Sequence, residues 1–522
     1  MIDKLIQKKY FPLILFFFAF GLFVVNNSNV SIYILDEAKN SECAREMLEQ
    51  NELLKPTFNY NLRKDKPPLH YFFMMVSYSI FGVNEWAARF FSAIFGALTI
   101  LITFLYSAKF LNRKTAFFTS LVLLSSLHLN IQFHLAVPDP YLIFFFCWSL
   151  FLFYSALETG KLSNKILMYV AIGFATLTKG PVAIALPGLI FLLFLIFTKQ
   201  FKWQIIKQLK PFAGIAIVLV IALPWFILNG IETNWEWTRD FFFKHNLSRF
   251  GGEMEGHGGI FLIPLLYVLI GMLPFSVFII PAIKLAWLNK KNTFLFFNMI
   301  TALTIIIFFS LSQTKLPNYT VPSYPFLAVI FAFYLNSLPE IKTNLKPYLI
   351  AILIISSALP VGGYFALKAD ASLSSASNTA LFLLILPLGV IISYILLIKK
   401  KPVKSIFAIV ITFILASVLF FTIIFPKIEN NNPVKNSLQY LENKEIAYYK
   451  RFNSSYLFYL KKKLPGLEEN EITPFFEKNP DGVLISAKKQ IDQINLPADY
   501  EIIFSGKDLF EYSTTVLISK KH

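Results

Sequence analysis

Two adjacent carboxylates, Asp36 and Glu37, open the stretch DEAKNSECAREML, directly after the first apolar segment of the chain. A third carboxylate, Asp139, stands between two prolines in VPDPYL, where another apolar segment begins. A carboxylate held in a fixed position can accept the proton of a reacting hydroxyl group. These residues are therefore candidates for acid–base chemistry beside apolar segments of the chain.

Lysines in comparable positions supply the opposite charge. Lys66 follows Asp65 in RKDKPPLHY, and Lys179 lies in LTKGP. Lys315 lies in SQTKLPNY, and Tyr319 closes that motif. The two prolines after Lys66 stiffen the chain and would hold its ammonium group in a defined direction. Because ammonium groups neutralise a phosphate that leaves with negative charge, these lysines point to a phosphate-bearing substrate.

Several of these residues also have an ordinary structural interpretation. Asp139 is suited to cap a helix that has Pro140 at its first position. Lys179 at the end of a helix suits the helix dipole. In the segment 230–259, His245, Arg249 and the glycines of RFGGEMEGHGG form either a mobile cover with a phosphate-facing arginine or a flexible connection.

The elements that must position these residues are membrane spans. The chain has 522 residues, of which 56% are hydrophobic and only 15% are charged, against about 25% in soluble proteins. A span needs roughly 20 apolar residues. The candidates are 11–25, 90–109, 115–131, 139–157, 165–178, 181–198, 211–229, 260–281, 293–311, 320–337, 347–367, 378–397 and 404–425. The first of them, with lysines before it and no cleavage site after it, is interpreted as a retained anchor.

The net charge of +17 is explained by membrane topology. When alternate spans exit and return, the short loops rich in Lys and Arg all fall on one side together with the N-terminus. The positive-inside rule makes that side the cytoplasm. The charge therefore gives no reason to expect a nucleic-acid partner, whereas membrane lipids are expected partners.

The sequence divides into a membrane domain, 1–426, and a soluble domain, 427–522, on the non-cytoplasmic side. Two long outer loops, 26–89 and 230–259, belong to the first domain. The tail carries 14 basic and 13 acidic residues and strand-like runs at 481–487 and 513–519, which favour a small α/β domain, with a helix near 453–463.

Two helices are expected in the first outer loop. One begins with Asp36 as its N-cap and lies on the membrane surface, with its glutamates turned away from an apolar stripe. A second, over 69–82, is apolar but too short to span the membrane. Together they would place the carboxylates and lysines at the outer membrane interface. A polyprenyl-phosphate sugar has matching chemistry, with an apolar tail, a phosphate at the interface and a sugar beyond it.

The motifs DEAKNSECAREML, RKDKPPLHYFF, VPDPYL, LTKGPVAIALP, LPWFILNG and SQTKLPNYTVP resemble, in order and spacing, those of the bacterial aminoarabinose transferase and protein O-mannosyltransferase superfamily. These are GT-C glycosyltransferases, and the resemblance covers roughly residues 1–335. It implies about thirteen spans in the bacterial inner membrane, a periplasmic soluble domain and inverting transfer from a polyprenyl phosphate.

The resemblance also implies roles for individual residues. Asp36 matches the catalytic aspartate of the first loop, Asp139 matches a second functional aspartate, and Lys66 matches a lysine that contacts the donor phosphate. Asp65 stands where the aminoarabinose enzymes commonly carry Glu. Tyr319 matches a donor-site tyrosine, and Arg249 matches a phosphate-contacting arginine; Lys179 and Lys315 are grouped with the donor site, and Glu37 and His245 are supporting residues.

The predicted function is transfer of one sugar from an undecaprenyl phosphate donor to a periplasmic acceptor, either lipid A or another envelope glycolipid. Transfer to Ser or Thr of exported proteins is the alternative within this class, and a transporter of lipid-linked glycans is the alternative of another class. No cofactor is expected beyond the donor lipid as co-substrate. No metal is expected either, because nothing in the sequence has metal-ligand spacing.

Overall fold

The computed structural model describes residues 2–247, 258–341, 343–494, 497, 499–509 and 511–521. Its α-helices in the first half are α1 (Ile2–Ile6), α2 (Phe11–Phe23), α3 (Leu35–Glu49), α4 (Leu69–Phe81), α5 (Glu85–Phe110), α6 (Arg113–Leu124), α7 (Leu127–Phe133), α8 (Asp139–Thr159), α9 (Leu162–Lys179), α10 (Val182–Phe197), α11 (Trp203–Gln208), α12 (Pro211–Glu232) and α13 (Glu236–Arg239). A π-helical turn, η1 (Asp240–Leu247), follows α13.

Further helices follow the second long loop. They are α15 (Ile263–Gly271), α16 (Ile279–Leu288), α17 (Thr293–Leu311), α18 (Tyr324–Ile341), α19 (Lys346–Ala369), α20 (Ile385–Ile398), α21 (Pro402–Leu419), α22 (Phe425–Glu429), α23 (Pro433–Ser437), α24 (Ser455–Leu460), α25 (Ile472–Lys478) and α26 (Lys488–Ile491). Short 3-10 or π-helical turns join several of them, namely η2 (Phe275–Phe278), η3 (Pro317–Ser323), η4 (Ser374–Leu384), η5 (Phe420–Ile424), η6 (Leu438–Tyr440) and η7 (Glu469–Glu471).

The long helices form a multi-pass membrane bundle. Among the described residues, eight helices are long and apolar enough to cross a membrane, or up to ten if each of two bent pairs counts as one span. Three shorter apolar helices, α2, α4 and α10, add to them. The thirteen predicted spans all fall on helices, and their number stays a prediction.

Ordinary helix signals set the bounds of these elements. Asn84 caps α5 by accepting a hydrogen bond from the backbone N–H of Ala87 at 2.9 Å, and Asn112 caps α6 from the N–H of Thr115 at 2.8 Å. Gly160 ends α8 in the left-handed conformation that favours glycine.

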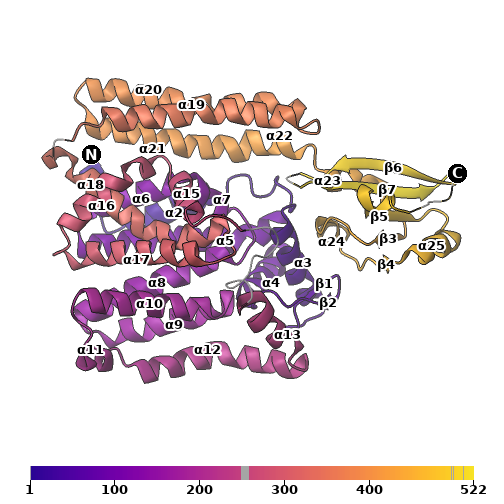
Figure 1. Ribbon diagram of the computed structural model, residues 1–522, viewed down its shortest axis with the longest axis horizontal. Coiled ribbons are helices and arrows are strands. Elements are labelled where there is room, and N and C mark those ends of the chain that lie inside the picture. The colour runs from indigo at the N-terminus through magenta and orange to yellow at the C-terminus, as the bar shows by residue number, and fades with distance from the viewer. Residues whose placement is uncertain are drawn as a thin grey trace.

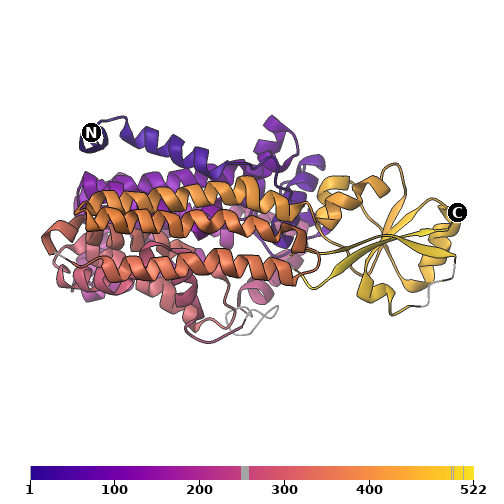
Figure 2. The ribbon, with the colours of Figure 1, turned by 90° about the horizontal axis from the view of Figure 1, so that it is seen from above.

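The molecule is elongated, with the helical bundle and a β-sheet lying end to end (Figure 1). The sheet runs β4 (Gly466–Leu467), β3 (Ile446–Tyr449), β5 (Val483–Ala487), β7 (Thr514–Lys520) and β6 (Tyr500–Lys507). β3 is parallel to β4 and β5, and β7 is antiparallel to β5 and β6. β5, β7 and α24 lie at the strands and the helix predicted in the tail. Figure 2 shows the same separation from above.

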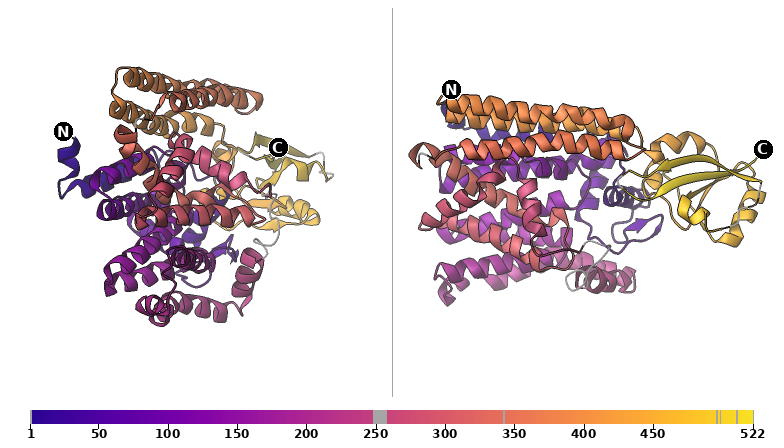
Figure 3. Two further views of the ribbon diagram at one scale, coloured as in Figure 1. Left: turned by 60° about the vertical axis from the view of Figure 1, so that its left-hand side comes forward. Right: turned by 45° about the horizontal axis from the view of Figure 1, so that its top comes forward.

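A layer of short elements lies between the bundle and the sheet. It contains α3, α4 and a small hairpin of β1 (Thr57–Phe58) and β2 (Asn61–Leu62), which Figure 1 and the right-hand view of Figure 3 place at the end of the bundle that faces the sheet. The N-terminus and α11 lie at the opposite end (Figure 1). We call the end of the bundle that carries α3, α4 and the hairpin the sheet end.

The structure corrects two expectations about α3. The helix begins at Leu35 with Ile34 as its N-cap, so Asp36 lies inside the first turn and does not cap it. Glu42 and Glu46 are fully buried and not turned toward water. Arg45 pairs with Glu42 at 2.7 Å, and the Thr57 hydroxyl donates to Glu46 at 2.6 Å. Because α4, α24 and the hairpin pack against it, α3 is enclosed on several faces, and its place at the membrane surface stays a prediction.

Candidate active site

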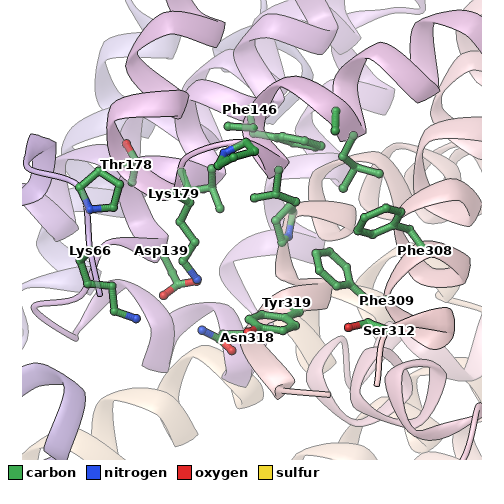
Figure 4. A pocket seen from close by; sticks show the side chains of 18 of the residues that line it. Lys66, Asp139, Phe146, Thr178, Lys179, Phe308, Phe309, Ser312, Asn318 and Tyr319 are labelled. Atoms are coloured by element: carbon green, nitrogen blue, oxygen red, sulfur yellow. The ribbon is translucent and has the colours of Figure 1, made fainter. Parts of the chain in front are cut away.

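A cavity of about 460 Å³ opens at the sheet end of the bundle. Its lining comes from the loop before α4, from α8, from the end of α9 and the beginning of α10, and from η1, α17 and η3. One end of the cavity is ionic, with Lys66, Asp139 and Lys179, and the aromatic side chains of Phe308 and Phe309 lie at the other end (Figure 4). The cavity therefore suits a ligand with a charged head and an apolar tail.

An ion pair lies at the polar end of the cavity. The Nζ atom of Lys179 lies 2.9 Å from Oδ1 of Asp139 and 5.3 Å from the ring centre of Tyr319. Asp139 is the first residue of α8, since Pro138 precedes it as the N-cap, and its carboxylate binds Lys179 and does not cap the helix. The capping interpretation of Asp139 is therefore wrong, and Lys179 bridges α9 to α8.

Lys66 reaches the same region from the loop before α4. It lines the cavity and points toward the Asp139–Lys179 pair (Figure 4). Its Nζ atom lies 3.7 Å from Oδ2 of Asp36, whose side chain is 56% exposed. Lys66 holds the pKa of Asp36 below its usual range, with help from Arg63 and Lys179. Asp36 is therefore ionised at neutral pH and stays open to an approaching group.

Hydrogen bonds and ion pairs fix the backbone on which Lys66 sits. Arg63 binds the neighbouring Asp65 through Nε and Oδ1 at 2.7 Å. The indole N–H of Trp237 donates to the carbonyl of Arg63 at 2.7 Å. Lys64 forms ion pairs with Glu236 and Asp240, the latter at 3.0 Å. The loop that carries Lys66 is therefore tied to α13 and η1.

The two adjacent carboxylates of α3 lie in different surroundings. Glu37 is 1% exposed and pairs through both oxygens with Arg89 of α5, at 2.7 and 2.8 Å. The N–H of Ala136 also donates to Glu37 at 2.8 Å. Glu37 does not line the cavity, so any support it gives to the site acts through the placement of α3.

Four other predicted residues do not line the described cavity. Asp36 is one of them and reaches its edge through the 3.7 Å contact with Lys66. Lys315 is buried and donates to the carbonyl of Ser312 at 2.7 Å, but it does not line the cavity. Arg249 lies outside the described residues. His245 is the sixth residue of η1, and its side chain lies outside the described part of the chain.

Sequence reasoning missed several residues that line the cavity. Asn318 and Ser312 belong to SQTKLPNY and line the cavity, with Asn318 beside Tyr319 and Ser312 beside Phe309 (Figure 4). Phe308 and Phe309 lie in the last turn of α17. The motif gave a signal for Asn318, whereas nothing in an apolar span marks which of its phenylalanines turn inward.

The described residues contain no group of three or more His, Cys, Asp or Glu side chains able to hold a metal ion. The two cysteines, Cys43 and Cys147, are both free and buried. The ionisable side chains that line the cavity are carboxylates, ammonium groups and the phenol of Tyr319, and metal independence stays a prediction.

Comparison with known proteins identifies the class of this chain. The family described as dolichyl-phosphate-mannose-protein mannosyltransferase matches residues 65–228. An uncharacterised protein of Aquifex aeolicus is 31% identical over 68% of this chain and 69% of its own length. Undecaprenyl phosphate-alpha-4-amino-4-deoxy-L-arabinose arabinosyl transferase 2 of Pseudomonas fluorescens is 30% identical over 61% of this chain and 58% of that protein.

The fold gives an independent comparison. The crystal structure of ArnT from Cupriavidus metallidurans bound to undecaprenyl phosphate superposes with a TM-score of 0.80, 21% identity and 98% coverage of both chains. This chain belongs to the GT-C glycosyltransferases. As a glycosyltransferase it is an enzyme and not the transporter considered as the alternative. The predicted fold class, a mostly helical membrane protein of the GT-C type, is confirmed.

Proposed function

We propose that this glycosyltransferase moves a single sugar from an undecaprenyl phosphate donor to lipid A or another envelope glycolipid, with inversion at the anomeric carbon. The reaction would take place at the outer face of a bacterial inner membrane. The observation that carries the proposal is the cavity itself, which is ionic at one end and apolar at the other. The relative from Pseudomonas fluorescens is named for transfer from the same class of lipid.

The apolar half of the cavity suits the polyprenyl tail. Phe146, Phe308 and Phe309 come from α8 and α17, and each aromatic side chain offers a large apolar surface to a ligand. A tail lying on these rings would place its phosphate near Lys66 and Lys179. Donor binding would then combine burial of the tail with charge neutralisation of the head.

The lysines favour the products of the transfer over its reactants. The donor is a phosphodiester with a single negative charge, and the bond between the anomeric carbon and the phosphate oxygen breaks so that its electron pair leaves with the phosphate. The leaving group is a monoester that carries more negative charge. Because an ammonium group binds the higher charge more strongly, Lys66 and Lys179 would stabilise the transition state more than the bound donor.

Asp36 would act on the acceptor side of the anomeric carbon. Its carboxylate is on α3, close to Lys66 but open to the outside. A serine hydroxyl must lose its proton to attack, and Asp36 would take it. A lipid A phosphate has a second pKa of about 6 and is largely ionised at neutral pH, so with that acceptor Asp36 would orient the nucleophile.

Further residues complete the proposed donor site. Asp139 would set the position of the Lys179 ammonium group, which it contacts at 2.9 Å. Tyr319 stacks beside that lysine and would limit its movement. Arg249 and His245 of the second long loop, and Lys315 of the α17–α18 connection, remain predicted members of the donor site.

The arrangement of the chain supports the proposed topology. The N-terminus and α11 lie at the end of the bundle opposite the sheet (Figure 1), and α11 lies in a lysine-rich loop, between Lys199 and Lys210. Such loops are retained in the cytoplasm. The sheet end, the cavity and residues 427–522 would then lie in the periplasm.

The proposed acceptor is tested in a strain that lacks the gene. Mass spectra of lipid A and of envelope glycoproteins are compared with those of the parent strain, and complementation with the intact gene serves as the control. Loss of one sugar from lipid A or another glycolipid supports the proposal. Loss of a sugar from exported proteins alone would instead favour protein O-glycosylation, which the match to the mannosyltransferase family also allows.

A further inference from the structure

The segment that leads into α3, residues 30–33, ends three residues before Asp36 and is fixed by hydrogen bonds from two directions. From the bundle, the guanidinium group of Arg89 donates to the carbonyl of Val30 at 2.6 Å and to that of Ser31 at 2.8 Å. Arg89 is 2% exposed and is itself held by Glu37. This side of the segment is therefore part of the bundle core.

The other side of the segment is bound by the C-terminal domain. The N–H of Ile32 donates to the hydroxyl of Tyr459 at 2.8 Å, and the hydroxyl of Ser455 donates to the carbonyl of Tyr33 at 3.2 Å. The Tyr33 hydroxyl donates to Asp508 at 3.1 Å and accepts from the N–H of Leu509 at 2.9 Å. Tyr33 is 6% exposed, so these bonds are shielded from water.

The same domain also packs against α3 and the hairpin next to it. Phe458 of α24 belongs to one apolar cluster with Cys43, Ala44 and Met47 of α3. The side-chain amide of Asn59 exchanges two hydrogen bonds of 2.9 Å with the backbone of Leu464. The domain therefore contacts α3 at its beginning, along its side and through the β1–β2 hairpin.

Packing behind residues 30–33 is incomplete. A cavity of about 80 Å³ lies there, lined by Tyr33, Ile34, Phe421 and Leu509 among others. A segment that borders a cavity has fewer packing contacts to hold it than a segment enclosed on all sides. Its position therefore depends strongly on hydrogen bonds, those from Arg89 on one side and those with the C-terminal domain on the other, which also include contacts of Glu429 and Asn432 with Ser31.

We infer that the C-terminal domain positions Asp36, with Tyr33 and Tyr459 as positioning residues that act through the first turn of α3. The inference rests on the proposed role of Asp36 in sugar transfer. The Asp36 carboxylate lies 3.7 Å from Lys66, so a shift of about 1 Å would change its alignment with both the lysine and an acceptor. Displacements of this size cost up to about a hundredfold in rate.

The inference is tested by removing the two hydroxyl groups from the full-length protein in a donor-lipid transfer assay. Tyr33→Phe keeps the ring and loses the bonds to Asp508 and Leu509. Tyr459→Phe keeps the ring and loses the bonds to Ile32 and to Glu85 of α5. Each variant is expected to lower kcat by about tenfold, and the double variant by up to about a hundredfold. The KM for the donor lipid should stay within twofold, because the cavity is unchanged.

Tyr456→Phe is the matched control. Its hydroxyl is also buried in α24 and pairs with Ser437 at 2.6 Å inside the C-terminal domain, without reaching residues 30–33. It should retain kcat within twofold. Equal values of kcat for the control and the two test variants would overturn the inference, and so would a change confined to KM.

The pH–rate profile separates positioning from general loss of structure. Lys66 lowers the pKa of Asp36 most, with Arg63 and Lys179 acting in the same direction, whereas partial burial and Asp65 raise it. A displaced Asp36 loses part of its contact with Lys66, so the acid limb of the profile should move to higher pH in the test variants only. Asp36→Asn distinguishes the two proposals. If this variant keeps full turnover, the proposed function of Asp36 fails. If it is inactive while the tyrosine variants are unaffected, only the positioning role is overturned.

Discussion

Two ionic clusters lie side by side at the sheet end of the bundle, and they differ in exposure. The cavity cluster consists of the lining residues Asp65, Lys66, Asp139, Lys179 and Tyr319 together with Asp36, which is 56% exposed and lies 3.7 Å from Lys66. In the core cluster, Glu37 and Arg89 are 1% and 2% exposed and bind through two short contacts. The carboxylates belong to consecutive residues of one helix, which the helical rotation of about 100° turns in different directions.

The difference assigns different tasks to the two clusters. Every nitrogen of the Arg89 guanidinium group has an acceptor, since Glu37 takes Nε and Nη2 and backbone carbonyls take the rest. A pair of this kind has no capacity left for a ligand and would be costly to open. The loose contact between Lys66 and Asp36 beside a cavity can be exchanged for a phosphate at much lower cost.

The largest effect is expected from Asp36→Asn. The substitution keeps the size of the side chain and removes the charge that would accept a proton or orient a nucleophile. Turnover should fall by about a thousandfold, within the range of 10² to 10⁴ for a general base. The thermal unfolding temperature should be unchanged because the side chain is half exposed. Transfer rates near those of the parent enzyme would remove Asp36 from the active site.

Glu37→Gln should have the opposite effect to Asp36→Asn, with a loss of stability and a smaller loss of activity. It leaves the Arg89 charge buried without its carboxylate, which costs on the order of 3 kcal/mol of folding free energy. The unfolding temperature of the purified protein in detergent should fall, and the enzyme that stays folded should transfer sugar at a rate closer to normal. A Glu37→Gln protein with unchanged stability but no activity would contradict the separation of the two clusters.

Lys66→Met examines the cation of the cavity cluster. Methionine keeps the apolar stem and removes the ammonium group that would bind the donor phosphate, while Lys179 remains. The value of kcat/KM should therefore fall by about 10 to 100-fold, equivalent to roughly 1.4 to 2.7 kcal/mol. Lys368→Met is a control because Lys368 is exposed and its hydrogen bond goes to Tyr364. Equal activities of the two variants would argue against a donor contact by Lys66.

Much of the cavity cluster could be predicted from sequence because its members interrupt an apolar chain. Asp65, Lys66, Asp139, Lys179 and Tyr319 come from four separate motifs, and all of them line one cavity. An ionisable group at the end of a span is costly without a partner, so its presence there is informative. Their functional roles remain proposals.

The core cluster and the burial of α3 could not be predicted in this way. The sequence places Glu42 and Glu46 on the side of α3 away from its apolar stripe, which normally means solvent. Burial of that side depends on the β1–β2 hairpin, whose Thr57 hydroxyl and Tyr60 N–H donate to Glu46, and on the ion pair between Arg45 and Glu42. Apolar periodicity carries no information on such contacts. The positions of Phe308 and Phe309 in the cavity wall could not be predicted either, because a membrane span carries apolar residues on its lipid-facing side and on a side that lines a cavity.

Glu46 provides the last and smallest test of the comparison, as a carboxylate that is buried like Glu37 but has no direct ion pair in the described part of the chain. It accepts hydrogen bonds from the Thr57 hydroxyl at 2.6 Å and the N–H of Tyr60 at 3.0 Å. Burial raises its pKa to about 7 from the usual 4.5, and the neighbouring Glu42 carboxylate contributes to the rise. The folded protein therefore holds a proton at pH values where the unfolded chain has released it.

The sign of the resulting pH dependence follows from proton binding. Below about pH 4.5 both states are protonated and Glu46 has no effect on stability, whereas between pH 4.5 and 7 the unfolded state binds fewer protons and stability falls as the pH rises. Glu46→Gln mimics the protonated form, so it should raise the free energy of unfolding at pH 8 by on the order of 2 kcal/mol and leave it nearly unchanged at pH 4.5. Thermal unfolding of both proteins across this range measures the difference. If Glu46→Gln stabilised the protein equally at all pH values, Glu46 would ionise normally. A buried carboxylate at this end of the bundle would then find a counter-charge without an arginine such as the one that pairs with Glu37.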